Sequence, residues 1–500
     1  MLYLIPIIPL IFLITAVILR RWRTGIVLIF IWLLAEDVIR RLIPGQPGQI
    51  MLIKDALIFL TYFSFIAAIA INPVRNCISN GVKGKKIWKP PFIVFLFLFI
   101  AFSLINVFNP QIPNLLFGII GLRSYLWYIP LAFLGYYMFS SKEKLLKFCR
   151  ILVYIAIPLF ILAAFQYVFY DVDNVLIRPF ATSHYYHSFS LVESGKIPLL
   201  SSVFGSVHRY ARFSMLLFFL GIGLLTIKRN KPRTFNTIES SRLAEKPVKV
   251  RGKLLIVSTI CAFLGITLSG SRSAFALTII GIVLFFLFAK YIKNNKILHL
   301  WRNSRIKIFT AILILLLTLP IIFFARDIGL FNISAFYYAF QERIPWMFDE
   351  FIRAFSEAKF FGIGTGTMSQ GLEYVPGGAE WIKYQTQEVR QGFWFETGIG
   401  KILFELGIIG LIFYYLFWGY LFYKMKEVIK RLKDSLLRSV GVAIFIFSFL
   451  ILVWFSFLHH QTFGDATTLV VFWFFIGVLF SLKGSKQELV NSKQEISLSS

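Results

Sequence analysis

The sequence predicts an all-α fold, a polytopic transmembrane bundle of about 12–13 helices with a large outer loop that contains an amphipathic helix. Three observations support this prediction. Hydrophobic residues make up 58% of the 500 residues, and the mean hydropathy is +0.74. Long apolar stretches recur from one end of the chain to the other, and the loops between them alternate in charge. A soluble domain is nearer half apolar, so most of this chain is expected to lie in lipid.

The apolar stretches have the length of membrane-spanning helices. Each is near the roughly 20 residues that a helix needs to cross the hydrocarbon core, whereas a transmembrane β-barrel would show short alternating strands. The predicted spans are 2–19, 24–39, 50–71, 90–107, 115–139, 151–169, 213–227, 254–269, 274–289, 308–325, 399–423, 439–457 and 467–482. The first span lacks a basic leader and a small-residue cleavage site, so we expect it to remain as a helix.

The positions of the charged residues predict the orientation of the bundle. One set of loops includes 72–89, 228–253 and 290–307, and together with the C-terminal tail it contains 36 of the 52 Lys and Arg residues. The loops on the opposite side contain 13. By the positive-inside rule the first set is cytoplasmic, which puts the N-terminus outside and the C-terminus inside. We expect a transmembrane bundle over 1–483 and a cytoplasmic tail over 484–500. Because topology explains the net charge of +28, no nucleic-acid partner is expected.

Two predicted outer loops, 170–212 and 326–398, are long enough to carry function. The second contains a segment that starts at Pro345, a favourable first helical position, and places Phe348, Phe351, Ile352 and Phe355 on one face. An amphipathic helix is expected there, lying on the membrane or on the bundle. Its alternative is a packing helix without chemistry. The three cysteines, Cys77, Cys149 and Cys261, predict no disulfide and no metal site.

Three alternating glycines, Gly362, Gly364 and Gly366, follow this segment in FFGIGTGTM. Glycines at this spacing can end a helix and let backbone N–H groups approach an anion. No Walker-type Lys-Ser/Thr follows them, so a plain turn is the competing interpretation.

Arginines at the predicted outer edge of the bundle are the main candidate binding residues. Arg272 lies in SGSRSAF, a turn of at most five residues between two apolar helices, and a guanidinium among serines there would suit an anion. Arg209 and Arg212 share a helix face where the first long loop returns to the membrane, and we predict that all three converge to bind a pyrophosphate. Arg123 is a weaker candidate for the same site. The alternative for each is contact with lipid headgroups or a helix cap.

Carboxylates and histidines are the candidate bases. Glu396 precedes the span 399–423, and Glu405 lies inside it, where a pair with Lys401 four residues earlier is the alternative to catalysis. No metal site is predicted, because the histidine spacings lack the acidic partners that zinc sites use. The histidines expected on the outer side are His184, His187, His208, His459 and His460.

Seven segments occur in an order that is typical of a known family. They are IMLIKDALIFL at 50–60, GLRSYLWYIPLAF at 121–133, IPLFILAAFQYV at 157–168, VFGSVHRYARFSM at 203–215, LSGSRSAFAL at 268–277, FFGIGTGTM at 360–368 and KILFELGIIGLIFYY at 401–415. With these segments the chain resembles the bacterial O-antigen ligase and polymerase superfamily, and the resemblance covers about 50 to 420, most of the chain.

This resemblance implies a function for the predicted outer face. Members of the superfamily transfer or polymerise glycans from undecaprenyl pyrophosphate carriers at the periplasmic face of the bacterial inner membrane. It implies a metal-independent glycosyltransferase without a cofactor, whose partners are the lipid-linked glycan donor, a glycan or lipid acceptor and membrane lipids. Arg353 and Gly364 also fit an arginine, ten residues, glycine spacing in the periplasmic loops of polymerases.

The chain departs from the ligases of this superfamily at one point. They carry a histidine motif in the large periplasmic loop, whereas 326–398 contains no histidine, which makes Glu396 the candidate base. Three alternatives stay open: a transporter or flippase for lipid-linked sugars, a non-catalytic component of an exopolysaccharide assembly complex, and a polyprenyl-phosphate monosaccharide transferase with Glu36 and Asp37 as its acidic residues.

Overall fold

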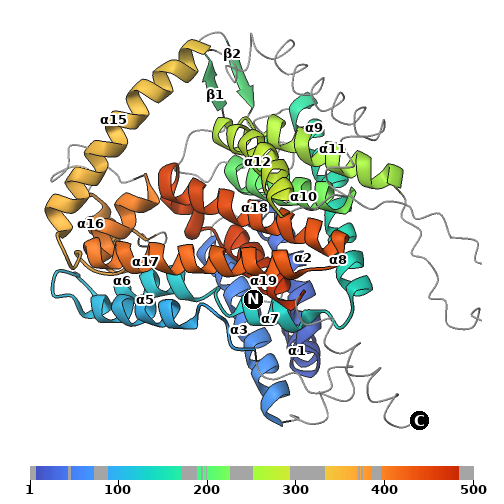
Figure 1. Cartoon of the computed structure of the whole chain (residues 1–500). Helices are drawn as coiled ribbons and strands as arrows, with labels where there is room; N and C mark the ends of the chain where they lie inside the picture. The colour runs from blue at the N-terminus through green and yellow to red at the C-terminus, as the bar shows by residue number, and fades with distance from the viewer. Residues whose placement is uncertain are drawn as a thin grey trace, which may run out of the picture.

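A computed structural model shows a bundle of α-helices (Figure 1). Among the residues that the structure describes, six helical stretches are long and apolar enough to cross a membrane, in agreement with the predicted all-α membrane fold. The residues described are 7–42, 47–71, 88–169, 189–192, 195–198, 200–225, 252–292, 333–369, 372, 375–383 and 396–482. The predicted span 308–325, the tail from 484, Cys77, and nearly all of the loops 228–253 and 170–199 lie outside them, with His184 and His187.

Every other predicted span overlaps a described helix. The candidate membrane spans are Leu52–Ala70, Leu115–Met138, Lys142–Gln166, Arg272–Tyr291, Gly398–Arg431 and Ser435–Phe457, and shorter apolar helices cover Ile93–Phe108, Gly252–Leu268 and Ala466–Ser481. The helices are α1 (Ile7–Arg20), α2 (Trp22–Leu42), α3 (Pro47–Ile71), α5 (Ile93–Ile105), α6 (Leu115–Leu126), α7 (Leu131–Met138), α8 (Lys142–Tyr154), α9 (Ala156–Val168), α10 (Val207–Leu225), α11 (Gly252–Leu268), α12 (Arg272–Tyr291), α15 (Ile333–Ala358), α16 (Gly378–Lys383), α17 (Gly398–Arg431), α18 (Ser435–Phe457) and α19 (Ala466–Ser481), with short 3-10 helices η2 (Asn106–Phe108) and η5 (His460–Phe463).

Three helices form the centre of the bundle. In α10 every side chain from Tyr210 to Leu224 is buried, and α19 is buried from Ala466 to Phe480. Most of α18 is buried as well. By contrast α3 and α5 expose large apolar side chains such as Phe63 and Phe97, as expected of helices that face lipid. The rest of the protein therefore covers α10, α18 and α19, and the polar groups at their ends are held within the bundle.

Small residues bring α7 and α19 into direct backbone contact. A Cβ atom on Gly135 would lie 2.1 Å from the carbonyl oxygen of Phe474, and one on Gly477 would lie 1.9 Å from that of Ala132. Membrane helices pack closely through such residues, because lipid supplies no hydrophobic drive for their association.

The structure corrects several predicted boundaries. The predicted span 115–139 agrees with the candidate membrane span Leu115–Met138, but a turn at 127–130, which contains Pro130, divides it into α6 and α7. Helix α8 begins at Lys142, between the predicted spans 115–139 and 151–169, because the Ser141 side chain caps it. An antiparallel pair of strands, β1 (Phe189–Val192) and β2 (Gly195–Pro198), was not predicted.

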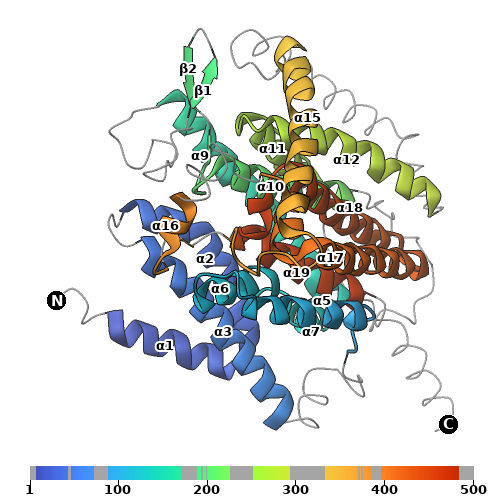
Figure 2. The same cartoon turned by 90° about the vertical axis from the view of Figure 1, so that its left-hand side faces the viewer.

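The amphipathic helix of the second long loop is α15, and its predicted start at Pro345 is wrong. The helix begins at Ile333 and includes Pro345 in its interior. Figures 1 and 2 show α15 along one side of the bundle, at a steep angle to α17. Its predicted apolar face is exposed, with Phe348 at 65% and Ile352 at 61%, whereas its opposite face packs on α17 through Ala354 and Ala358.

Candidate functional site

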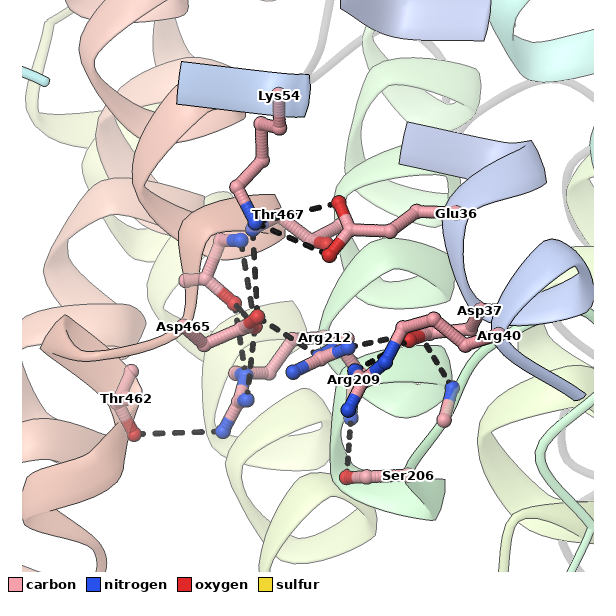
Figure 3. A network of polar contacts seen from close by, with 12 residues as sticks. Glu36, Asp37, Arg40, Lys54, Ser206, Arg209, Arg212, Thr462, Asp465 and Thr467 are labelled. Carbon is pink, nitrogen blue, oxygen red and sulfur yellow. Dashed lines mark hydrogen bonds and ion pairs between the residues drawn. The ribbon is translucent and has the colours of Figure 1, made fainter. Parts of the chain in front are cut away.

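A network of charged side chains joins α10 to α2 and to the start of α19 (Figure 3). Arg209, in the first turn of α10, lies between two carboxylates. Its Nη1 is 2.7 Å from Oδ2 of Asp37, and its Nε is 2.8 Å from Oδ1 of Asp465. The remaining members of this arginine network are Glu36, Arg40, Lys54, Arg212, Thr462 and Thr468.

Arg212 lies one turn further along α10 and binds the same carboxylate. Its Nη2 is 3.0 Å from Oδ2 of Asp465, and its Nε donates to Oγ1 of Thr468 at 2.9 Å. The guanidinium also lies over the ring of Trp454, 5.4 Å from the centroid. The side chain is 6% exposed, and that of Arg209 is 21% exposed. The predicted shared face of the two arginines is therefore used for Asp465.

The acidic residues of the predicted first outer loop are paired and buried. Lys54 donates to both carboxylate oxygens of Glu36, at 3.1 and 3.2 Å. Asp37 accepts from Arg209, from Arg40 at 3.2 Å and from the backbone N–H of Gly205 at 2.6 Å. Among the described residues, these ion pairs join the cationic groups of Arg40, Lys54, Arg209 and Arg212 to the carboxylates of Glu36, Asp37 and Asp465.

Arg272 lies outside the ion pairs of this network. It is the first residue of α12, half-buried, and Ser271 caps the helix by accepting from the N–H of Ala274 at 3.4 Å. The hydroxyl of Ser271 is 3.1 Å from Nδ1 of His208, which precedes Arg209. Among the residues that the structure describes, Arg272 has no carboxylate within ion-pair distance. The three arginines therefore come from neighbouring helix ends, and two of them share Asp465.

Arg123 binds a carboxylate of its own. Its Nη2 is 2.6 Å from Oδ2 of Asp55, and the hydroxyl of Tyr128 is 3.4 Å from the other oxygen. This pair joins α6 to α3.

The glycine loop after α15 is bound to a kink in α17. Gly407 has φ +66° inside that helix, which releases the carbonyl groups of Phe404 and Glu405 from their helical partners. These accept from the N–H groups of Ile363 at 2.9 Å and Gly364 at 3.0 Å. The carboxylate of Glu405 accepts from the N–H of Met368 at 2.8 Å, and the Lys401 ammonium lies 3.7 Å away, as the predicted pair requires. These N–H groups already have protein acceptors, which favours the turn interpretation of the loop.

Glu396 and Arg353 lie at the edge of the α15 and α17 contact. Glu396 directly precedes Thr397, whose hydroxyl caps α17 by accepting from the N–H of Gly400 at 2.9 Å. A Cβ atom on Gly398 would meet Phe455, so this helix end touches the end of α18 that carries Trp454. Arg353 is exposed on α15.

Sequence reasoning did not single out two residues that the structure makes central. Asp465 precedes an apolar helix with Thr467 and Thr468 in its first turn, a capping pattern that marks a helix start but says nothing of arginine partners. Glu350 lies one turn before Ala354 and two before Ala358, and this small-residue stripe could have indicated a buried face.

No protein-family model matches this chain, and no curated protein matches it.

Proposed function

We propose that this chain is a membrane glycosyltransferase of O-antigen ligase or polymerase type, which uses glycans linked to undecaprenyl pyrophosphate at the periplasmic face. The observation that carries the proposal is the setting of Arg272. This guanidinium has no carboxylate partner among the described residues, and the neighbouring Ser271 hydroxyl is 3.1 Å from Nδ1 of His208, the residue before Arg209. A guanidinium without a counterion suits an anionic ligand such as a pyrophosphate.

The other arginines support this proposal with separate tasks. The ion pairs of Arg209 use Nε and Nη1, so Nη2 lies outside them, and the side chain is 21% exposed. Arg212 is almost fully buried and fixes Asp465, which in turn fixes Arg209. We assign Arg272 and Arg209 to the pyrophosphate and Arg212 to positioning. Donors held in place before the substrate arrives stabilise developing charge without reorganisation.

The proposed reaction is a direct displacement. The oxygen of an acceptor hydroxyl forms a bond to the anomeric carbon of the donor, and the bond from that carbon to the pyrophosphate oxygen breaks. The proton of the hydroxyl passes to the carboxylate of Glu396, and the electron pair leaves with the pyrophosphate. Arginine charge stabilises the leaving group, the role that a divalent ion has in other transferases.

The monosaccharide-transferase alternative has less support from the geometry. It needs a free acidic residue in the first outer loop, but the carboxylate of Asp37 is buried and accepts three hydrogen bonds. Glu36 is buried against Lys54. A base must be able to reach a substrate proton.

Substitution of Arg272 tests the proposal against the transporter and scaffold alternatives. Purified protein in proteoliposomes would be given a glycan linked to undecaprenyl pyrophosphate, and glycan transfer measured for the Arg272→Lys and Arg272→Ala variants. If Arg272 binds the leaving group, Ala should lower turnover by about a hundredfold or more, and Lys should recover only part, because an ammonium keeps the charge without the planar fork.

Arg431→Ala is the matched control, since this arginine also lies at a helix end but is 60% exposed at the opposite end of α17. It should transfer glycan as wild type does. Near-normal transfer by Arg272→Ala, or equal transfer by Lys and wild type, would contradict the leaving-group role. If the wild-type protein moved the lipid-linked glycan across the membrane without transferring it, a transporter would be favoured.

A further inference from the structure

The carboxyl group of Glu350 joins α15 to the first turn of α17. Its Oε1 accepts from the backbone N–H of Thr397 at 2.9 Å and from the Thr397 hydroxyl at 2.8 Å. The same hydroxyl caps α17, so one threonine connects the carboxyl group to the helix start. Glu350 is fully buried, and it is the polar residue of the face on which α15 packs.

The sequence at the start of α17 leaves room for this carboxyl group. A Cβ atom on Gly400 would lie 2.2 Å from Oε1 of Glu350, and any larger residue would displace it. Gly400, the second glycine of TGIGK, is therefore needed for the contact between α15 and α17.

The burial of Glu350 lacks a compensating cation. Within the described part of the chain, no Lys, Arg or His forms an ion pair with it, and its buried Oε2 has no hydrogen-bond partner. Asp349 and Arg353 flank it on α15. Glu396 precedes the cap of α17, and Lys401 lies in that helix, where it is paired with Glu405. Burial, and secondarily the charge of Glu396, raise the pKa of Glu350 to about 7, although hydrogen bonds from Thr397 and Glu396 oppose the shift.

We propose that Glu350 is a positioning residue that docks α15 on α17 in a proton-dependent way. This docking also fixes the position of Glu396, which lies two residues before Gly398 at the start of α17. The inference rests on the proposed function in one respect, since it gives the position of Glu396 a role in glycan transfer. The docking itself is independent of that function.

The direction of the pH dependence follows from proton linkage. A carboxyl group with an ordinary pKa of 4.5 when α15 is released, and about 7 when it is docked, binds the proton more tightly in the docked state. Docking is therefore strongest below pH 4.5 and weakens as the pH rises through 7. Between pH 5.5 and pH 8 the docking equilibrium should shift about 30-fold toward release.

Hydrogen exchange measured by mass spectrometry tests the docking without any substrate. In the purified protein, the protection of the Thr397 amide, corrected for the intrinsic pH dependence of exchange, should fall about 30-fold between pH 5.5 and pH 8. Glu350→Gln stays uncharged and should remove this dependence, and Gly400→Ala should lower protection at both pH values. Glu357→Gln, on the exposed side of α15, is the matched control and should behave as wild type.

Glycan transfer is the second measurement. Wild-type kcat should decline above pH 7 with little change in KM, and the decline should be absent in Glu350→Gln. Equal exchange profiles for wild type and Glu350→Gln would overturn the docking proposal even if transfer is normal. A pH-dependent exchange profile without any transfer in wild type would leave the docking established and contradict the proposed function instead.

Discussion

Asp465 forms ion pairs with two guanidinium groups of α10 and caps the start of α19. Arg209 and Arg212 bind its two oxygens, and the same oxygens accept the N–H groups of Thr467 and Thr468 at 3.3 Å. A charge in this position is retained because every lone pair has a donor. The position of α10 against α19 thus depends on one carboxylate.

Asp465→Asn is predicted to destabilise the protein by about 3 kcal/mol or more, because it leaves the buried Arg212 guanidinium without its counterion and Arg209 with Asp37 alone. Asparagine can still cap α19, so the capping contribution is kept. Asp434→Asn is the matched control: Asp434 caps α18 through the N–H groups of Leu436 and Leu437, but its ion pair with Lys142 is about one-third exposed. The control should cost about 1 kcal/mol at most. Thermal unfolding followed by tryptophan fluorescence compares the two, and equal losses would contradict the role of Asp465.

At the scale of single residues, the sequence identifies the arginines of the candidate site better than their acidic partners. Helical spacing alone places Arg209 and Arg212 on one helix face. The free-energy cost of a charged side chain at the membrane alone makes Arg272 a candidate. Their acidic partners could not be predicted, because Asp37 is 172 residues from Arg209 and Asp465 is 253 residues from Arg212. Such pairs follow from how the helices pack, which no local pattern records.

Among the elements, the glycine loop and the kink in α17 stabilise each other. Gly407 interrupts the helix, and the N–H groups of Ile408 and Ile409 then donate to the carbonyl oxygens of Lys359 and Phe360. In return the carbonyl groups of α17 accept from the loop. The interrupted helical bonds are thus replaced across the contact, as lipid-buried backbone requires.

Gly366→Ala is predicted to destabilise the protein more than Gly377→Ala. Both glycines have positive φ, +94° and +77°, so both substitutions carry the backbone cost of about 1–2 kcal/mol. A Cβ atom on Gly366 would also lie 1.9 Å from the carbonyl oxygen of Phe117, whereas one on Gly377 meets open space. Unfolding temperatures of the two variants separate steric overlap from backbone strain. If Gly377→Ala lost as much stability as Gly366→Ala, the close approach of the loop to α6 would not matter.

Element boundaries show what hydropathy can and cannot predict. The apolar patterns located α12, α18 and α19 closely, since each is a continuous apolar run that follows a polar cap. The predicted span 213–227 starts six residues after α10 begins, because Arg209 and Arg212 interrupt the apolar run at the helix start. The predicted start of α15 at Pro345 is twelve residues too late. Proline is typical of the first position of a helix, but it can also lie inside one. The separation of α6 from α7 follows a turn at Tyr128 to Pro130 that an apolar stretch conceals.

For the whole molecule, the arrangement separates charge from the centre. The arginine network lies where α10 begins and α18 and the η5 segment lead into α19, whereas the basic residues Lys424, Lys426, Lys430 and Arg431 lie at the other end of α17. Composition predicted a membrane protein because burial of so much apolar surface needs lipid. It could not predict which helices are central, since α5 is the more apolar of the two in sequence, yet α5 exposes large apolar side chains and α10 is buried.

The orientation of the bundle is the last prediction, and it rests on the distribution of Lys and Arg between the two sets of loops. In a variant without native cysteines, Ser240→Cys lies in the basic loop 228–253 and should resist a membrane-impermeant thiol reagent in intact cells. Ser356→Cys, on the exposed side of α15, should react. After permeabilisation both should react, which controls for local access. The reverse pattern would place α15 and the arginine network on the cytoplasmic side, where a periplasmic glycan donor would never meet Arg272.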